Sequence, residues 1–331
     1  MDISIRNLSV RFATDSGEVP AVNHVSLSFP DNKVTGIIGE TGSGKSVLGL
    51  SILGLLQPNA TVLGSIMYGN RELTSLKEKE LCKVRGKEIA FVAQNPATSL
   101  NPSIRVGKQI EEVFRRSQKS KAKSHEEMLK LLEQMAFQNP RKTARLYPFE
   151  LSGGMRQRIL AAIAVAAHPQ WIIADEPTTA LDVTVQAQVL ELLEELQEEM
   201  DTSILLITHN LGVVWKMCDT VMVMYAGKTV EYATAKNLYL NPMHPYTWGL
   251  LDSMPKLSDE VKGELNTISG TPPDLRLTGN CCNFCNRCQY ATEICSKEVP
   301  PLMELEEGHF VACHRQNKKE QLRRGEVKEN G

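Results

Sequence analysis

The chain has 331 residues, of which 42% are apolar and 23% charged. This is ordinary globular composition, which excludes a disordered chain and a fibrous repeat, and the length favours a core domain of about two hundred residues or more plus a smaller unit. The 37 basic and 39 acidic side chains nearly cancel, leaving a net charge of -2. No overall field therefore draws the chain to nucleic acid or anionic lipid, and we expect no nucleic-acid partner.

No stretch approaches the roughly 20 apolar residues that a membrane-spanning helix needs. The best run, 159–167, is closed off by Arg158 and His168. The N-terminus lacks the basic start and apolar stretch of a secretory signal, which predicts a cytosolic protein. Cytosolic thiols stay reduced, so the crowding of six of the eight cysteines into residues 281–313 favours metal binding over disulfides.

The first segments have strand patterns. Residues 3–12 and 22–29 alternate apolar and polar side chains around a Gly- and Pro-containing turn, which predicts two half-buried antiparallel strands. Residues 34–38 form a short apolar run that meets a glycine-rich loop, and helical spacing begins at Lys45. We expect a strand, a loop and a helix in that order.

The middle of the chain changes to helical patterns. Residues 103–146 lack a strong strand signal and predict a helical insert. Its basic stretch, 115–123, is typical of a solvated helix face, and we assign it no function. Residues 171–174 then form a buried-strand run, 185–200 mark one face of a helix, and 203–208 form another strand, so a β-α-β alternation is expected.

The core pattern ends in a predicted hairpin over residues 221–231. Beyond Asn241 the sequence becomes rich in proline and then in cysteine, which predicts a domain boundary near residues 235–255. About the last seventeen residues are highly charged, and we expect them to be frayed.

The loop from Gly39 to Ser46 fits the pattern G-x-x-x-x-G-K-[ST]. Glycines permit positive φ and close approach, so that successive N-H groups can bind phosphate oxygens at a helix N-terminus. Lys45 would reach the β and γ phosphates, and the Ser46 hydroxyl would bind Mg2+. The alternative, a glycine-rich turn with an unrelated lysine, leaves the strand before it and the helix after it unexplained.

An acidic pair ends the strand at 171–174. Parallel-sheet logic places Asp175 at the carboxyl edge, where it can bind Mg2+ directly or through water. Glu176 would lie on the other side of the strand end, within reach of a water aimed at the γ phosphate, and we assign it as general base. The alternative is a surface turn before Pro177.

A third motif, Leu151-Ser-Gly-Gly-Met-Arg-Gln-Arg158, lies between the loop and the acidic strand. Together with Gln94, Ala180-Leu181-Asp182 and His209, this order of motifs resembles the nucleotide-binding subunit of an ATP-binding cassette (ABC) transporter, over about residues 3–235. The resemblance implies a P-loop NTPase of the α/β class, with an antiparallel β subdomain and a helical subdomain.

By this resemblance, Ser152, Gly153 and Gly154 contact the γ phosphate of ATP held by a partner subunit, so that two cassettes sandwich two nucleotides. Small residues with free N-H groups at a helix start suit such a clamp; a lone Ser-Gly-Gly would be an ordinary helix cap. Gln94 corresponds to the sensor that touches Mg2+ and the attacking water, and its loop meets the membrane subunits.

His209 resembles the histidine that contacts the γ phosphate and orients the general base. Asn210 stands where close relatives often have aspartate, a departure that would tune the loop. Phe12 is placed like the aromatic that stacks on adenine, with a strand-end core aromatic as the alternative. The complete predicted nucleotide site comprises Phe12, Gly39, Thr41, Gly42, Ser43, Gly44, Lys45, Ser46, Val47, Gln94, Ser152, Gly153, Gly154, Asp175, Glu176, Asp182 and His209.

Cys282, Cys288, Cys295 and Cys313 are spaced C-x5-C-x6-C-x17-C. With His244-Pro-Tyr-Thr247, this spacing resembles the C-terminal extension of the dipeptide, oligopeptide and nickel branch of the family, which in some members holds a 4Fe-4S cluster on these four cysteines. A purely local interpretation instead selects C-x2-C-x2-C, which includes Cys285. Zinc on four thiols is the alternative metal, and reduced thiols without metal are the simplest alternative.

The resemblance implies the ATPase of a membrane importer for di- or oligopeptides. Its expected partners are a second, related cassette, two permease subunits and an extracytoplasmic binding protein, at the cytoplasmic face of the membrane. The nearest alternative is a nickel or metal-chelate importer; a soluble ABC ATPase and a redox-sensing module with vestigial ATP use are others. We predict an ABC domain at 1–240, its helical subdomain at about 95–160, and a Cys-rich extension at 241–331.

Overall fold

The computed structural model describes residues 1–116, 120–178, 183–254 and 268–316. The fold divides into two compact units. The first unit contains Met1, Pro30–Lys33 and Ser75–Ile207, and the second contains Asp2–Phe29, Val34–Thr74 and Thr208–Gly331.

The second unit opens with an antiparallel sheet of β1 (Ile3–Thr14), β2 (Gly17–Phe29), β4 (Ala60–Tyr68) and β5 (Arg71–Glu72), in the order β2-β1-β4-β5. The two predicted antiparallel strands are thus confirmed. Both are longer than predicted, because Thr14 pairs with Gly17 and the expected loop continues the ladder. The strands β4 and β5 were not predicted.

A second sheet in this unit joins strands that are distant in sequence. Strand β3 (Val34–Ile38) runs parallel to β9 (Thr220–Tyr225), and β10 (Lys228–Thr234) pairs antiparallel with β9, as the predicted hairpin requires. Beyond β10 come β12 (His309–Val311) and β11 (Met303–Glu306), so two late strands extend this sheet. Every residue of β3 is buried.

Helices and short turns complete the second unit. The α-helices are α1 (Lys45–Ile52), α9 (Leu211–Met217), α10 (Ala235–Leu240) and α11 (Pro245–Asp252). Short 3-10 helices are η3 (Leu275–Leu277), η4 (Cys285–Arg287) and η5 (Glu293–Ser296), and η1 (Leu73–Ser75) lies where the units divide. The domain boundary expected after residue 240 falls between α10 and α11, inside this unit, and stays a prediction.

The first unit contains a parallel sheet of β6 (Ile89–Val92), β7 (Trp171–Asp175) and β8 (Ser203–Ile207). Between β7 and β8 comes α8 (Val183–Met200), which confirms the expected β-α-β order. Trp171 is fully buried, and its indole N-H donates to the carbonyl of Met1 at 2.8 Å. Both β7 and β8 are buried along their length, as is typical of strands in a parallel sheet.

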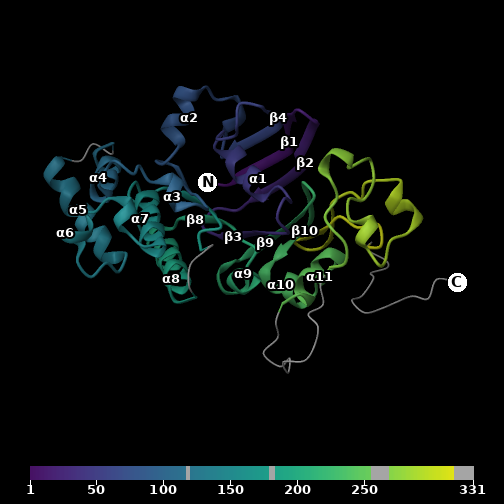
Figure 1. The fold of residues 1–331 in the computed structure, drawn as a ribbon. Coiled ribbons are helices and arrows are strands. Elements are labelled where there is room, and N and C mark those ends of the chain that lie inside the picture. The colour runs from purple at the N-terminus through teal and green to yellow at the C-terminus, as the bar shows by residue number, and fades with distance from the viewer. Residues whose placement is uncertain (117–119, 179–182, 255–267, 317–331) are drawn as a thin grey trace. The chain divides into compact units, whose positions relative to one another are not determined.

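The remaining helices of this unit are α2 (Glu78–Val84), α3 (Pro96–Ser99), α4 (Val106–Arg116), α5 (Lys121–Gln134), α6 (Pro140–Thr143), η2 (Pro148–Glu150) and α7 (Gly153–Val165). Figure 1 shows α4, α5 and α6 gathered together, which confirms the predicted helical insert. Helix α7 packs against α3, α4, α5 and α8. In the ranges that the structure describes, no helix is both long and apolar enough to cross a bilayer.

Candidate functional site

The glycine-rich loop connects β3 to α1, which is the predicted strand, loop and helix. Gly39, Gly42 and Gly44 have φ of 150°, 82° and 99°. A Cβ on Gly39 would lie 2.2 Å from the Met224 carbonyl oxygen, and one on Gly44 equally close to that of Ala21. No side chain fits at Gly39 or Gly44, so the loop depends on glycine for both its dihedrals and its close packing.

Lys45 is buried at the start of α1. Its Nζ donates to the carbonyl oxygens of Gly39 at 2.7 Å and Glu40 at 2.8 Å. Ser43 is buried as well, whereas Thr41 is exposed and Ser46 and Val47 are half-buried. The loop therefore folds around the lysine ammonium, the group that the sequence assigns to the phosphates.

Three predicted residues of the first unit come together at the carboxyl ends of β6 and β7. Asp175 is the buried last residue of β7, and Glu176 follows it with φ of 45°, a conformation that is uncommon for a residue with a side chain. The Glu176 N-H donates to the Ile207 carbonyl at 2.8 Å. The Gln94 side-chain amide donates to Glu176 Oε2, also at 2.8 Å. Backbone strain of this kind recurs where a side chain must be aimed for chemistry.

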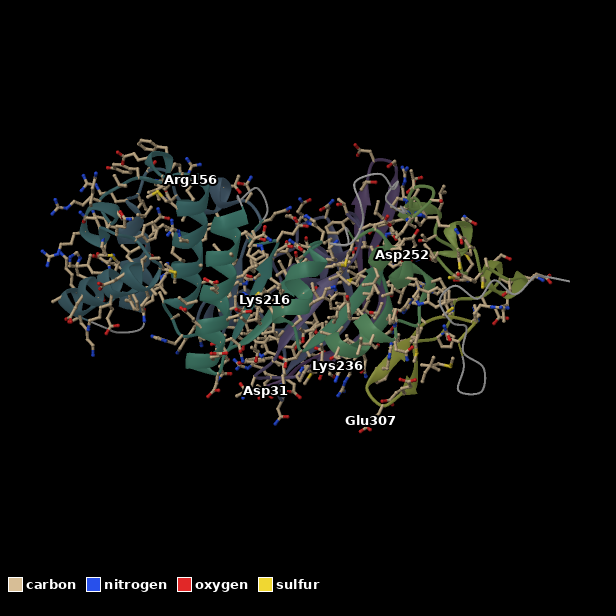
Figure 2. All side chains as sticks on the ribbon, turned by 90° about the horizontal axis from the view of Figure 1, so that it is seen from below. Asp31, Arg156, Lys216, Lys236, Asp252 and Glu307 are labelled. Carbon is tan, nitrogen blue, oxygen red and sulfur yellow. The ribbon has the colours of Figure 1, made fainter. Side chains whose placement is uncertain are left out.

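The Ser-Gly-Gly motif starts α7. Ser152 is the N-cap, and its hydroxyl accepts a hydrogen bond from the Met155 N-H at 3.3 Å. Ser152 and Gly153 are exposed, and a Cβ added to Gly153 would meet nothing within 4 Å. Arg156, one turn on and labelled in Figure 2, donates through Nε to the Pro148 carbonyl at 2.8 Å. Arg156 thus holds the first turn of this 13-residue helix against Pro148, while Ser152 and Gly153 at its start are exposed.

The remaining predicted residues are less decisive. His209 is exposed, and Asn210 caps α9 by accepting from the N-H groups of Gly212 and Val213. This capping role suits asparagine and explains how the chain tolerates the departure from aspartate. Phe12 is half-buried in β1, opposite Val19 of β2. Asp182 lies outside the described residues.

Comparisons with known proteins agree with this geometry. The ABC transporter family profile matches residues 22–179, and the profile described as "Oligopeptide/dipeptide transporter, C-terminal region" matches residues 230–295. The chain is 46% identical to the oligopeptide transport ATP-binding protein OppD of Escherichia coli over 312 residues, which cover 94% of this chain and 92% of OppD. It is 45% identical to the dipeptide transport ATP-binding protein DppD of Lactococcus lactis, with 93% and 89% covered.

This chain belongs to the ATPase subunits of the oligopeptide/dipeptide ABC transporters. The solved dimeric structure of the ATP-binding cassette MJ0796 bound to ADP and Pi is similar to it, with a TM-score of 0.64 and 25% identity, over 70% of this chain and 98% of that one. The P-loop fold of the α/β class, its antiparallel β subdomain and the ATPase activity expected from the sequence are thereby confirmed.

The C-terminal region of this transporter ATPase gathers its cysteines. All eight cysteines are described, and all are free thiols. Burial raises the pKa of Cys282 and of Cys288 to about 11, and that of Cys313 to about 12. The thiolate charges of Cys288, Cys282 and Cys295 raise the pKa of Cys313 further. The four predicted ligands are therefore close enough to interact.

Cys285 lies near these residues as well. Besides burial, a negative charge on Cys285 raises the pKa of Cys282 and of Cys288, and burial and the charge of Cys281 raise the pKa of Cys285 itself. No three His, Cys, Asp or Glu side chains of the described ranges converge tightly enough to hold a single metal ion. Cysteine is the residue type that binds such metals, but burial favours the protonated thiols here, and neither an iron-sulfur cluster nor zinc is confirmed.

The motif His244-Pro-Tyr-Thr247 has a structural role. The fully buried carboxylate of Glu231, on β10, accepts hydrogen bonds from the N-H groups of Met243 and His244 and from the Thr247 hydroxyl. Nε2 of His309, on β12, lies 2.8 Å from Oε1 of Glu231. The Glu231 carboxylate thus connects β10, β12 and the start of α11 by hydrogen bonds.

Sequence reasoning missed a contact on the phosphate loop. Glu40, the second residue of the loop, is held by the guanidinium of Arg287, with Nη1 to Oε2 at 2.7 Å and Nη2 to Oε1 at 3.0 Å. The Glu40 N-H donates to the Tyr246 hydroxyl at 2.8 Å. Tyr246 lies in a motif that the sequence singled out, but a separation of 247 residues between Glu40 and Arg287 leaves no local pattern to read.

Proposed function

We propose that this chain binds ATP with Mg2+ and hydrolyses it to drive the import of di- or oligopeptides. The observation that carries the proposal is the phosphate loop, in which positive-φ glycines surround the buried ammonium of Lys45. Such a loop supplies N-H groups and a cation to an anionic polyphosphate. The OppD and DppD relatives are named for oligopeptide and dipeptide transport, which supports the choice of substrate.

Each predicted residue has a distinct task. Lys45 neutralises the β and γ phosphates, and the Ser46 hydroxyl and the buried Asp175 carboxylate supply the oxygen ligands that Mg2+ prefers. Glu176 takes the proton of the attacking water, and Gln94 orients the Glu176 carboxylate and that water. His209 contacts the γ phosphate. Phe12 and Asp182 keep the roles that the family resemblance implies.

The signature motif would complete the site of a second cassette. The exposed start of α7 offers free N-H groups and a positive helix end to the γ phosphate of ATP on the partner. The dimeric form of the similar MJ0796 cassette supports this arrangement. We infer that the partner is a related but different cassette, and that two permeases and an extracytoplasmic binding protein complete the importer, with this chain at the cytoplasmic face.

Nucleotide binding by the purified chain tests the first part. Titration with a fluorescent ATP analogue should give saturable, Mg2+-dependent binding that Lys45→Ala weakens by at least about tenfold, because the loop loses its cation. The exposed Lys79→Ala serves as the control for loss of a lysine. Equal affinities of wild type and Lys45→Ala would remove the basis of the proposal.

The transported substrate requires a different measurement. The associated extracytoplasmic binding protein should be titrated with short peptides of varied sequence and with nickel complexes. Saturable binding of peptides, without binding of nickel complexes, is the expected result. The reverse would assign the chain to a nickel or metal-chelate importer of the same branch.

We also propose that Cys282, Cys288, Cys295 and Cys313 hold a 4Fe-4S cluster, with zinc as the alternative. Cysteine thiolates are the usual ligands of both, and the other three cysteines lie near enough to Cys313 to raise its pKa. Protein purified without oxygen should be brown, with broad visible absorption and bound iron and sulfide. Colourless protein with stoichiometric zinc would exclude the cluster in favour of the alternative.

A further inference from the structure

We propose that Arg287 is a positioning residue for the phosphate-binding loop, and that the C-terminal region controls ATP affinity through it. The inference rests on the proposed ATP site and concerns a residue to which neither the sequence motifs nor the family resemblance assigns a role. Its basis is the bidentate pair of Arg287 and Glu40.

The pair is well buried for an ion pair. The side chain of Arg287 is 5% exposed and that of Glu40 28%. The guanidinium also donates to the carbonyls of Ser269 and Ile268 and to the Tyr225 hydroxyl. Two parallel N-H to carboxylate bonds fix both groups in orientation as well as in distance. Arg287 is therefore a rigid holder of Glu40.

Glu40 in turn touches the catalytic lysine. Its side chain is bound by Arg287, its N-H by the Tyr246 hydroxyl, and its carbonyl oxygen accepts from Lys45 Nζ at 2.8 Å. All three polar groups of this one loop residue are thus occupied. The position of Arg287 is relayed to the lysine that meets the phosphates.

The charge of Glu40 gives the pair a second purpose. A carboxylate within a phosphate-binding loop repels the polyphosphate, and the repulsion is strong where burial lowers the local dielectric. Arg287 neutralises that carboxylate and holds it by both oxygens. Without the arginine, an uncompensated negative charge would remain in the loop.

The neighbours of Arg287 anchor it to the same part of the fold. The Asn283 side-chain amide donates to the Ala226 carbonyl at 2.9 Å, and the N-H of the next residue, Gly227, donates to the Ser43 carbonyl in the loop at 3.0 Å. The buried ring of Phe284 packs against Tyr246 with 5.4 Å between centroids. The turn that carries Arg287 is therefore a fixed platform beside the loop.

Substitutions at both partners test the proposal through ATP affinity of the full chain. Arg287→Gln should weaken binding of a fluorescent ATP analogue by roughly tenfold, because Glu40 is left charged and unpaired. Glu40→Gln alone removes the repulsion and should weaken ATP binding less than Arg287→Gln does. The double variant should bind more tightly than Arg287→Gln, a recovery that loss of folding stability alone cannot produce.

Three further measurements make the outcome decisive. Arg276→Gln is the matched control, because Arg276 also pairs with a carboxylate, Asp274, but in an exposed turn. Arg287→Lys keeps the positive charge but lacks the two parallel N-H donors, so its ATP affinity should lie between those of wild type and Arg287→Gln. Thermal unfolding identifies any variant that fails to fold, in which case the Glu40→Gln and Arg287→Lys variants decide.

Two results would overturn the proposal: affinity of Arg287→Gln within twofold of wild type, or strictly additive losses in the double variant. Failure of the ATP site itself is separate, because Lys45→Ala would then bind as wild type does, whatever Arg287 does.

Discussion

The side-chain amide of Gln94 donates a 2.8 Å hydrogen bond to Oε2 of Glu176. Gln94 follows β6 and Glu176 follows β7, so two neighbouring parallel strands deliver these groups to one edge of the sheet. An amide that donates to a carboxylate fixes the direction in which its free lone pairs point, which is what a base that must meet a positioned water requires.

The first prediction concerns the general base. Glu176→Gln keeps the size of the side chain and an oxygen for Gln94 to bind, but it cannot take a proton from water. We expect ATP turnover of the assembled complex to fall by about a hundredfold or more, with ATP affinity retained. The exposed Glu306→Gln, on β11, is the isosteric control. Unchanged turnover in Glu176→Gln would assign the base elsewhere.

The second prediction concerns the exposed start of α7. Because a Cβ on Gly153 meets nothing within 4 Å, Gly153→Asp should fold, but it sets a negative charge where the partner's phosphate is expected. Turnover of the assembled complex should drop by about a hundredfold while the isolated chain binds ATP as before. Gly279→Asp is the control, since the surroundings of Gly279 are equally open. Equal loss in both variants would argue against a role for the motif.

Much of this arrangement was readable from the sequence because the signals are local. The glycines and Lys45 stand within eight residues, and an apolar run before them and helical spacing after them are enough to place the loop. The start of α7 and the end of β7 were found in the same way. The lengths of β1 and β2 were underestimated because pairing across the turn at Thr14 and Gly17, not composition, decides where the strands stop.

The parts that were missed depend on contacts between distant residues. A buried Glu231 has no sequence signature, since its carboxylate is stable only because His244, Thr247 and His309 fold around it. Likewise, the sequence assigned no role to Arg287, which stands between two cysteines. Its role depends on the ion pair with Glu40, which only the fold brings near.

A third prediction concerns the thiols. Cys288→Ser and Cys313→Ser should abolish the visible absorption and the bound iron of anaerobically purified protein, because each removes one of the four proposed ligands. Cys82→Ser, at an exposed cysteine outside the cluster, is the control. Cys285→Ser decides between the two ligand sets. Retained colour in this variant is expected; loss of colour would place Cys285 among the ligands.

A fourth prediction concerns pH. Burial lowers the pKa of His244 from 6.5 to about 4, so between these values the folded chain binds fewer protons than the unfolded chain. The contribution of neutral, buried His244 to stability is complete above pH 6.5 and is lost as the pH falls toward 4. At about 1.4 kcal/mol for each pKa unit, the free energy of unfolding should decrease by about 3 kcal/mol over this range.

His244→Asn tests this origin of the pH dependence. Asparagine retains an oxygen that can accept the Tyr246 N-H now bound by Nδ1 of His244, but it does not titrate. Chemical denaturation at pH 7, 5.5 and 4.5 should therefore show a flatter dependence of the unfolding free energy on pH for the variant than for the wild type. Parallel profiles of the variant and the wild type would assign the acid sensitivity to other groups.

The central claim is that this chain supplies one half of an ATPase that drives peptide import. The most direct measurement is ATP hydrolysis by the complete importer in lipid vesicles, with the binding protein and a short peptide added together. Peptide should stimulate hydrolysis in the wild-type complex, and Glu176→Gln in this chain alone should abolish the stimulated rate. Hydrolysis that ignores peptide but responds to a nickel complex, or that persists at the wild-type rate in Glu176→Gln, would contradict the account.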